Sequence, residues 1–242
     1  MRVSPVNPSE SYTWLLNRHY AKRIPPISHA FGLYEGSVVS GVITFGVPVS
    51  STLRGGVAGE GYVKDVLELN RLCINSANKG AASCLVSNSI SQLPKGKIIV
   101  SYADTSMGHV GYVYQASNFI YTGLSAKRSD WKIRGQEHLH SATVADMSRG
   151  HENRAEYMRE RFGDDFYLED RPRKHRYIFF HGSKTYKKAA RKALLYKVMP
   201  YPKGRTQRYN DAGYTEQQLV LFASSPSGGN EITKQKEKNN AK

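Results

Sequence analysis

Apolar positions along the chain change their spacing several times, and each spacing predicts a different element. Continuous or alternating apolar runs predict strands over residues 29–34, 38–45, 66–74, 98–100, 119–121 and 171–180. Apolar positions about three to four residues apart predict helices over residues 12–19, 82–93 and 184–195, and a charged helix over residues 153–162. Residues 47–61 are predicted to form a loop, and residues 137–140 a polar surface strand.

The order of these elements predicts the fold class. Residues 29–34 and 38–45 flank Glu35-Gly36, a turn pair that favours an antiparallel hairpin. The later strand–helix–strand order, from residue 66 to residue 100, favours a parallel, right-handed crossover. The sequence therefore predicts an α/β fold with a mixed twisted sheet flanked by helices.

Polar side chains are concentrated directly after the apolar run at residues 98–100. They comprise Tyr102, Asp104, Thr105, Ser106 and His109, with Gly108 and Gly111 beside them. In open α/β sheets, ligands bind beyond the carboxyl ends of the strands, and glycine lets the backbone approach a ligand closely. We therefore expect a functional site here, and an ordinary capped turn is the alternative.

A second candidate site follows the strand at residues 66–74. This strand carries Glu68, Asn70 and Arg71, which are costly in a buried strand unless they are paired or face a cleft. A turn of small residues leads into the next helix, whose N-terminus favours anions through its free N–H groups and its dipole. Lys79 and Ser83 would add donors there. The P-loop pattern GxxxxGK[ST] is absent from this stretch.

Composition argues against a membrane span and a cysteine-based zinc site. Hydrophobic residues make up 39% of the 242 positions, and no apolar run approaches the roughly 20 residues that a spanning helix needs. The first residues lack the apolar segment of a signal peptide. Cys73 and Cys84 fall in a predicted strand and a predicted helix without a CxxC pattern, so we expect two core residues in a reducing cytoplasm.

Charge points to a polyanionic partner. The formal net charge is +15 and the pI is about 9.7. Residues 171–210 contain thirteen Lys or Arg, interleaved with five tyrosines, and no Asp or Glu. A solvated basic face is the simpler explanation, but the missing acids and the aromatic residues favour nucleic acid. The candidate phosphate contacts are Arg171, Arg173, Lys174, Arg176, Lys187, Lys188 and Arg191.

The charge distribution also suggests a division of the chain. We expect a core over residues 1–125, which carries both candidate sites, and a basic α+β extension over residues 126–210 that binds nucleic acid. A tail would follow over residues 211–242, and its Ser, Gly, Asn and Lys content predicts disorder from about residue 224.

Several short motifs resemble known families. Residues 78–82, which read NKGAA, resemble the pyrophosphate-binding turn of the GNAT N-acyltransferases. Residues 114–119 resemble that family's Tyr-x-x-x-Gly-Phe segment, with Asn118 in place of Gly. The combination of His19-Tyr20, LNRLCI and YADTSMGHVGYVYQASNF resembles the Mom DNA-modification proteins of Mu-like bacteriophages. This second resemblance covers roughly residues 10–125 in detail.

The resemblance implies a GNAT-like fold and a phage-encoded transferase in the host cytoplasm. The enzyme would convert adenine in double-stranded DNA to N6-carbamoylmethyladenine, which resists host restriction nucleases. The implied catalytic residues are His19, Tyr20, Asp104 and Tyr114, with Asp104 as base and Tyr114 as acid. An acyl donor, acetyl-CoA or a related compound, would contact Arg71, Asn78, Lys79, Gly80 and Ser83. Iron is also associated with this family, and His19 and Asp104, with His109 as a further candidate, suit it by residue type.

Some alternatives remain open at this point. One is a GNAT enzyme that acetylates amines of proteins or small molecules, and another is a nucleic-acid-binding protein without catalytic activity. Acetyl-CoA alone does not supply the amide nitrogen of a carbamoylmethyl group, so another donor or a later rearrangement is needed. An extruded adenine would stack on Tyr102, Tyr112 or Tyr121. Both a monomer and a homodimer are compatible with the sequence.

Overall fold

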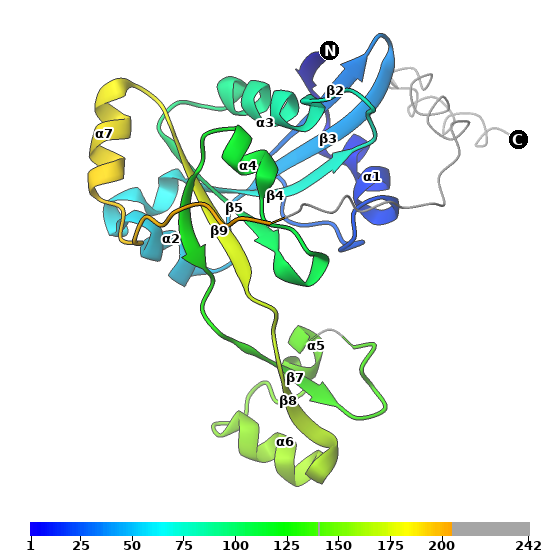
Figure 1. The fold of residues 1–242 in the computed structure, drawn as a ribbon. Coiled ribbons are helices and arrows are strands. Elements are labelled where there is room, and N and C mark those ends of the chain that lie inside the picture. Colours follow the sequence, from blue (N-terminus) through cyan, green and yellow to red (C-terminus); the bar gives the residue numbers. More distant parts are fainter. Residues whose placement is uncertain (140, 205–242) are drawn as a thin grey trace, which may run out of the picture. The chain divides into compact units, whose positions relative to one another are not determined.

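The computed structural model describes residues 1–139 and 141–204. In this part of the chain the strands form one seven-stranded sheet, in the order β1-β2-β3-β4-β5-β9-β6, and one two-stranded sheet, β7-β8 (Figure 1). The described residues fall into two compact units. The first unit comprises residues 1–46 and 71–93, and the second comprises residues 47–70 and the described residues from Pro94 onward. Each unit is described by itself.

The first unit is a small antiparallel sheet covered by a helix. Its strands are β1 (Arg2–Pro5), β2 (His29–Glu35) and β3 (Val38–Gly46), and its helices are η1 (Pro8–Ser11), α1 (Tyr12–Asn17) and α3 (Ala81–Gln92). The β2–β3 hairpin runs from His29 opposite Phe45 to Glu35 opposite Val38, as the sequence predicts. Helix α3 packs on all three strands and buries Leu85, Val86 and Ile90, which confirms its predicted apolar stripe (Figure 1).

The first helix is shorter than predicted. The periodicity predicts a helix up to His19, whereas α1 ends at Asn17. The backbone N–H groups of Arg18 and His19 both donate to the carbonyl of Trp14, at 2.9 and 3.2 Å. One carbonyl serves two successive N–H groups, so the regular helical hydrogen-bond ladder stops there.

The second unit carries the central strands. Strand β4 (Val66–Ile74) begins in this unit and pairs in parallel with β5 (Lys97–Asp104), which confirms the predicted crossover through α3. Strand β9 (Lys174–His181) pairs antiparallel with β5 along its whole length and with β6 (Ile120–Leu124) on its other side. The predicted α/β class with a mixed sheet and flanking helices is therefore confirmed.

The second unit also contains the helices α2 (Ser51–Ala58), η2 (Glu60–Asp65), η3 (Thr105–Met107), α4 (Tyr112–Ala116) and α7 (Lys184–Lys192). Of these, α2 and α7 contribute to the core of the sheet. Residues of α2, β4, β5, β9 and α7 form one buried core, which comprises Val57, Ala58, Val66, Ile98, Val100, Ile178, Phe180 and Ala190. Among the described residues, no helix is both long enough and apolar enough to cross a membrane.

The prediction of a loop over residues 47–61 is wrong, because α2 and the start of η2 lie within these residues. Ser50 caps α2 by accepting a hydrogen bond from the backbone N–H of Leu53 at 3.2 Å. Val57 and Ala58 at the end of the helix are buried in the core. Packing of this kind offsets the cost of glycine in a helix, which is about 1 kcal/mol per residue.

Residues 129–170 form a lobe with its own core. The lobe consists of β7 (Ser129–Ile133), α5 (Ser141–Asp146), α6 (Arg154–Phe162), η4 (Gly163–Asp165) and β8 (Phe166–Asp170). Its buried residues are Ile133, Val144, Met158 and Phe166. The strand predicted over residues 137–140 is not observed at residues 137–139, where Leu139 N–H donates to Gln136 in a turn, and residue 140 lies outside the described part.

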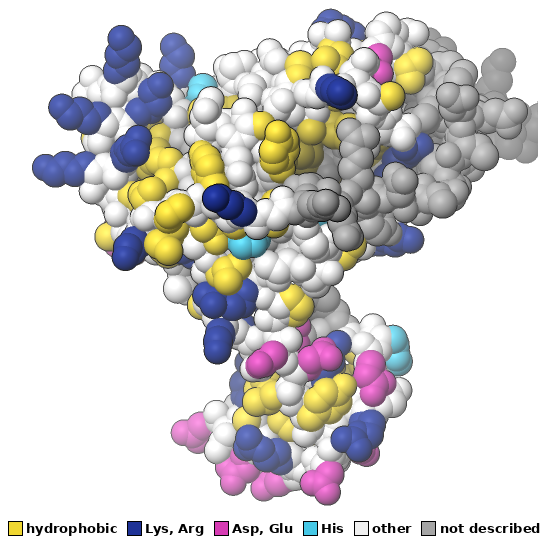
Figure 2. All heavy atoms as spheres, viewed as in Figure 1, with side chains coloured by type: hydrophobic (Ala, Val, Ile, Leu, Met, Phe, Trp, Pro, Cys, Tyr) yellow, Lys and Arg dark blue, Asp and Glu magenta, His cyan; other side chains and the backbone are white. Residues whose placement is uncertain are grey.

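The lobe differs in charge from the extension expected over residues 126–210. Residues 129–170 contain ten Asp or Glu and six Lys or Arg. The basic residues of the extension therefore lie mainly after residue 170, in β9 and α7. Figure 2 shows Lys and Arg gathered over α7 and Asp and Glu gathered over the lobe. The tail beyond residue 210, including its predicted disorder from about residue 224, lies outside the described residues.

A glycine substitution tests the packing beneath α4. Gly111 has a φ of +74°, and a Cβ there would lie 2.7 Å from Cζ and 2.9 Å from the hydroxyl oxygen of Tyr177. We expect Gly111→Ala to lower the free energy of unfolding by about 2–4 kcal/mol, because left-handed backbone strain and overpacking add. Gly36 is the control, since it has a φ of +63° with nothing within 4 Å. Gly36→Ala should cost only about 1–2 kcal/mol in denaturant melts. Equal losses for the two variants would contradict the packing of Tyr177 against this loop.

Candidate functional site

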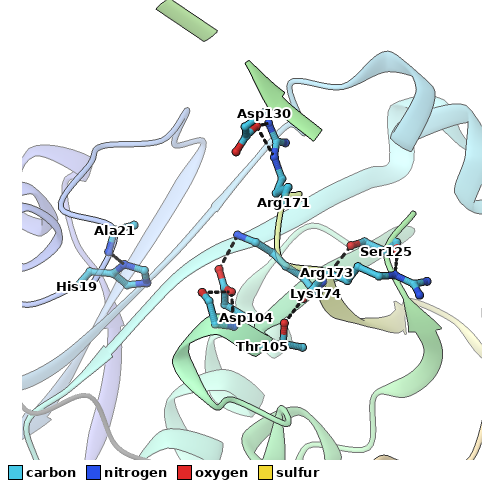
Figure 3. A network of polar contacts seen from close by, with 10 residues as sticks. His19, Ala21, Asp104, Thr105, Ser125, Asp130, Arg171, Arg173 and Lys174 are labelled. Atoms are coloured by element: carbon cyan, nitrogen blue, oxygen red, sulfur yellow. Dashed lines mark hydrogen bonds and ion pairs between the residues drawn. The ribbon is translucent and has the colours of Figure 1, made fainter. Parts of the chain in front are cut away.

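Asp104 is a buried carboxylate at the carboxyl end of β5. Its side chain is 9% exposed. One oxygen accepts hydrogen bonds from the backbone N–H and the hydroxyl of Ser106, at 3.1 and 2.6 Å, and the other pairs with the Lys174 ammonium at 2.9 Å (Figure 3). The Asp-Thr-Ser sequence produces the first set of contacts locally, because an Asp side chain readily caps the following turn. The β5–β9 register produces the second, because it places Lys174 opposite Asp104.

The contacts of Asp104 set its protonation state. Burial alone would raise the pKa of the carboxyl group, but the hydrogen bonds from Ser106 and the hydrogen bond and charge of Lys174 lower it below its ordinary value of 3.8. Asp104 is therefore ionised at neutral pH and is a weak proton acceptor. This electrostatic environment favours Asp104 as a fixed negative charge over the base that the sequence suggested.

His109 has the properties of a proton acceptor. It lies between Gly108 and Gly111, which both have positive φ, and its backbone N–H donates to the Asp104 carbonyl at 3.1 Å. Burial lowers the pKa of the His109 ring below 6.5, and the opposing effect of the nearby Asp104 charge is smaller. The ring is therefore neutral at pH 7, next to a carboxylate that would stabilise its protonated form.

Tyr114 is buried inside an aromatic cluster. Its ring lies 5.4 Å from that of Phe119 and 5.3 Å from that of Tyr177, measured between centroids. Burial raises the pKa of its hydroxyl, and a hydrogen bond with Ser101 opposes this only in part. Tyr114 is therefore protonated at neutral pH, as an acid must be before it donates.

Asp104 and Tyr114 do not share a face of β5. Successive side chains of a strand point to opposite faces, so Asp104 and Tyr102 lie on one face and Ser101 on the other. Tyr114 contacts Ser101, and Tyr177 lies opposite Ser101 in the register. The strand therefore separates the two groups that the sequence suggested as an acid–base pair.

The pairing of β5 changes close to this position. Its parallel pairing with β4 runs from Ile98, opposite Val66, to Ser101, opposite Leu69. Pairing of β5 with β9 continues further, to Asp104. The polar residues thus follow the point at which the pairing of β5 with β4 ends, and such a place in a sheet favours ligand binding.

His19 and Tyr20 belong to the first unit. The His19 ring is 8% exposed and accepts a hydrogen bond from the Ala21 backbone N–H at Nδ1, at 3.1 Å (Figure 3). The Tyr20 ring stacks on it with centroids 4.4 Å apart. An accepting Nδ1 carries no proton, so a neutral His19 ring carries its proton on Nε2.

The residues expected to bind an acyl donor also lie in the first unit. Gly80 is the N-cap of α3 with a φ of +83°, and the helix has no side-chain cap. Lys79 is exposed, and the Ser83 hydroxyl donates to the Gly80 carbonyl at 3.0 Å. Asn78 donates to Glu35 at 2.7 Å, and Arg71 donates to the Arg23 carbonyl at 3.3 Å. Asn78 and Arg71 thus have structural contacts, whereas the first turn of α3 keeps the features of an anion site.

The expected phosphate contacts divide into two groups. Those on or near β9 have partners within the protein: Arg171 pairs with Asp130, Arg173 donates to the Ser125 carbonyl, Lys174 pairs with Asp104, and Arg176 donates to Thr122 and lies over the Tyr196 ring. Those on α7, Lys187, Lys188 and Arg191, are exposed (Figure 2). The structure therefore favours α7 as the external basic surface.

Sequence reasoning did not assign three of the interactions that shape the site. His109 was recognised as part of a polar stretch and as a further candidate iron ligand, but not as a proton acceptor, although its place between two glycines was a usable signal. The partnership of Lys174 with Asp104 depends on strand register, which no local pattern encodes. The same holds for Tyr177, whose hydroxyl donates to the Val110 carbonyl beneath the His109 loop.

Iron was expected at His19 and Asp104 by residue type. Within residues 1–139 and 141–204, no group of three or more His, Cys, Asp or Glu side chains is arranged to hold a metal ion. His19 and Asp104, the ligands suggested by residue type, belong to different units.

Solved structures similar to this chain include acetyltransferases. An acetyltransferase of the GNAT family from Bacillus cereus is 14% identical, covers 75% of this chain and 98% of its own, and has a TM-score of 0.40. An N-acetyltransferase from Staphylococcus aureus is 13% identical, covers 74% and 97%, and has a TM-score of 0.39. The yncA protein of Salmonella typhimurium, solved with acetyl-CoA, is 15% identical, covers 54% and 83%, and has a TM-score of 0.38. These low scores mark a distant likeness and assign neither an activity nor a cofactor to this chain.

Sequence relatives give a firmer result. The methylcarbamoylase mom of Escherichia phage Mu is 27% identical over 212 residues, which cover 84% of this chain and 84% of that protein. The family model described as the Mom protein family matches residues 1–203, which is most of the 242 residues. This chain therefore belongs to the Mom protein family.

Proposed function

We propose that this protein is a DNA-modifying transferase that converts adenine to N6-carbamoylmethyladenine and so protects phage DNA from host restriction. The observation that carries the proposal is membership of the Mom family over residues 1–203, together with a relative named as a methylcarbamoylase. The polar groups at the end of β5 and the exposed basic face of α7 support it.

The reaction needs a base that acts on the exocyclic amine. The lone pair of adenine N6 is delocalised into the ring, so the amine becomes a useful nucleophile only as its proton is removed. His109 is suited to accept that proton because its ring is neutral at pH 7. The ionised Asp104 would stabilise the imidazolium that forms. Tyr114 also stays protonated, but it lies on the opposite face of β5 from Asp104, so we assign it no proton transfer in this step.

An acyl-CoA donor fits the first turn of α3. Gly80 brings no side chain to the N-cap, so the N–H groups of that turn have no side-chain acceptor, and Lys79 adds a positive charge. The donor's pyrophosphate would bind there, and its thioester would supply an activated acyl group. The product joins N6 to a CH2 group and ends in a primary amide, whereas acyl transfer alone would join N6 to a carbonyl carbon. Another donor, or a later rearrangement that also introduces the amide nitrogen, is therefore required.

Double-stranded DNA is the proposed macromolecular substrate. Adenine N6 is not accessible to an enzyme site within a stacked duplex, so the base must first be displaced. Contacts from Lys and Arg to phosphate hold a protein on DNA without reading its sequence. The exposed residues of α7 would supply these contacts, since the cations of β9 already have partners within the protein.

Nucleoside mass spectrometry of DNA from cells that express the protein tests the proposal directly. Adenosine that carries a carbamoylmethyl group supports it. Unmodified DNA together with a newly acetylated protein or small-molecule amine would instead support an amine acetyltransferase. Absence of any modification would contradict both enzymatic functions.

Substitution of His109 tests the proton acceptor. We expect His109→Gln to lower the rate of DNA modification at least about a hundredfold, because general base catalysis contributes that much. Rates are measured on added DNA in cell extract, which supplies the donor. His138→Gln is the matched control, since His138 is an exposed histidine of the lobe and should leave the rate unchanged.

The pH dependence provides a second test of His109. Its pKa lies below 6.5, and the protonated ring does not accept a proton. The wild-type rate should therefore reach a plateau toward neutral pH and be half-maximal at a pH below 6.5. A half-maximal rate above pH 6.5, or a pH profile of His109→Gln that matches the wild-type profile, would contradict the assignment.

Neutralisation of α7 tests the DNA surface. Replacing Lys187, Lys188 and Arg191 with Gln should weaken DNA binding and flatten its salt dependence, by about 0.9 in the log–log slope for each phosphate that is no longer neutralised. The control replaces three lobe residues, Arg149, Arg159 and Arg161, and removes the same charge. Binding titrations at several salt concentrations should show an unchanged slope for this control. Equal changes in the two triple variants would contradict a specific role of α7.

A further inference from the structure

Tyr112 is an aromatic side chain that the fold leaves exposed. It is the first residue of α4 and is 67% exposed, more than any other aromatic residue among the described positions. Tyr12, at 38%, and Tyr201, at 45%, come next. A single exposed tyrosine is ordinary on a protein surface, so its meaning depends on how it is held and on what lies beside it.

The backbone that carries Tyr112 is held by buried contacts. Gly108 and Gly111 have φ values of +64° and +74°, and the Tyr177 ring packs directly against Gly111. The Tyr177 hydroxyl donates to the Val110 carbonyl. Gln115 Nε2 contacts the same carbonyl at 3.2 Å and the Tyr177 hydroxyl at 3.1 Å. The loop thus presents an exposed ring from an anchored backbone, which is the arrangement of a preorganised binding residue.

Tyr112 follows the candidate proton acceptor closely in the chain. Two residues separate it from His109, so the Cα atoms of the two residues lie at most about 11 Å apart. The other two tyrosines considered for stacking are engaged elsewhere. Tyr121 is 7% exposed and its hydroxyl lies 2.8 Å from His175 Nδ1, and Tyr102 is half-buried against the core beneath α2 and α7.

We propose that Tyr112 is the stacking platform for the base displaced from DNA, and that it holds this base beside His109. This inference rests on the proposed function, because it assumes a nucleic acid substrate. Every nucleobase has a π face, so stacking on a tyrosine does not require a particular sequence, and the platform determines position rather than sequence preference. The exposed ring is available before DNA arrives, so no rearrangement of the protein is needed.

The experiment compares two DNA duplexes that differ at one position. In one, 2-aminopurine replaces a single adenine opposite an abasic site, and in the other the same base is fully paired. Wild-type protein should bind the first duplex on the order of tenfold more tightly, and its 2-aminopurine fluorescence should fall on binding, because stacking quenches it. Tyr112→Phe keeps the ring and should retain both effects. Tyr112→Leu should lose both and bind the paired duplex as the wild type does.

Tyr12→Leu is the matched control, because it removes an exposed tyrosine from α1 and should behave as the wild type. Unchanged melting temperatures verify that all variants fold. Two results would contradict the stacking role of Tyr112 without contradicting DNA binding. In one, Tyr112→Leu still prefers the duplex with the unpaired base and still quenches its fluorescence. In the other, Tyr112→Leu loses affinity equally for both duplexes. If the wild-type protein binds neither duplex, the proposed function fails and the inference fails with it.

Discussion

The pairing of β9 with β5 determines where the functional groups of the second unit lie. The register runs without interruption from Lys97, opposite His181, to Asp104, opposite Lys174. It brings the ammonium of Lys174 to the Asp104 carboxylate on one face and places Tyr177 opposite Ser101 on the other. A shift of one residue would reverse both faces of β9, so the ion pair and the support beneath the His109 loop would disappear together.

The ion pair also explains how charge is distributed in this protein. A buried carboxylate without a partner would be costly, and Lys174 with Ser106 keeps Asp104 ionised at little cost. Lys174 thus already has an anionic partner within the protein, although its side chain is 40% exposed. The arginines of β9 are similarly engaged with backbone carbonyls and Thr122. A basic strand in the sequence is therefore a structural element here, and the exposed positive charge lies on α7, whose Ala190 is buried and whose Lys187, Lys188 and Arg191 face solvent.

Local patterns were sufficient to predict most strands and the α/β class, because alternation and turn pairs act over a few residues. They predicted the β2–β3 hairpin and strand β4 with its crossover to β5. They failed at α2, where burial of Val57 and Ala58 overrides the preference of glycine for loops. They also could not place β9 between β5 and β6, since about seventy residues separate β5 from β9 and pairing over that distance leaves no local signal. For the same reason the sequence identified Asp104 as important but assigned it the role of base, which its contact with Lys174 disfavours.

The opposite faces of β5 suggest different roles for Asp104 and Tyr114. The charge of Asp104 raises the pKa of the His109 ring. Tyr114 instead packs on Tyr177, whose ring lies against Gly111. The backbone N–H of Tyr114 also donates to the Gly111 carbonyl at 2.9 Å. The packed rings of Tyr114 and Tyr177 thus support the loop that carries both His109 and Tyr112. A change in Tyr114 would alter the position of that loop as well as remove a hydroxyl group. Its catalytic contribution therefore has to be separated from its structural one by a variant that keeps the ring, such as Tyr114→Phe.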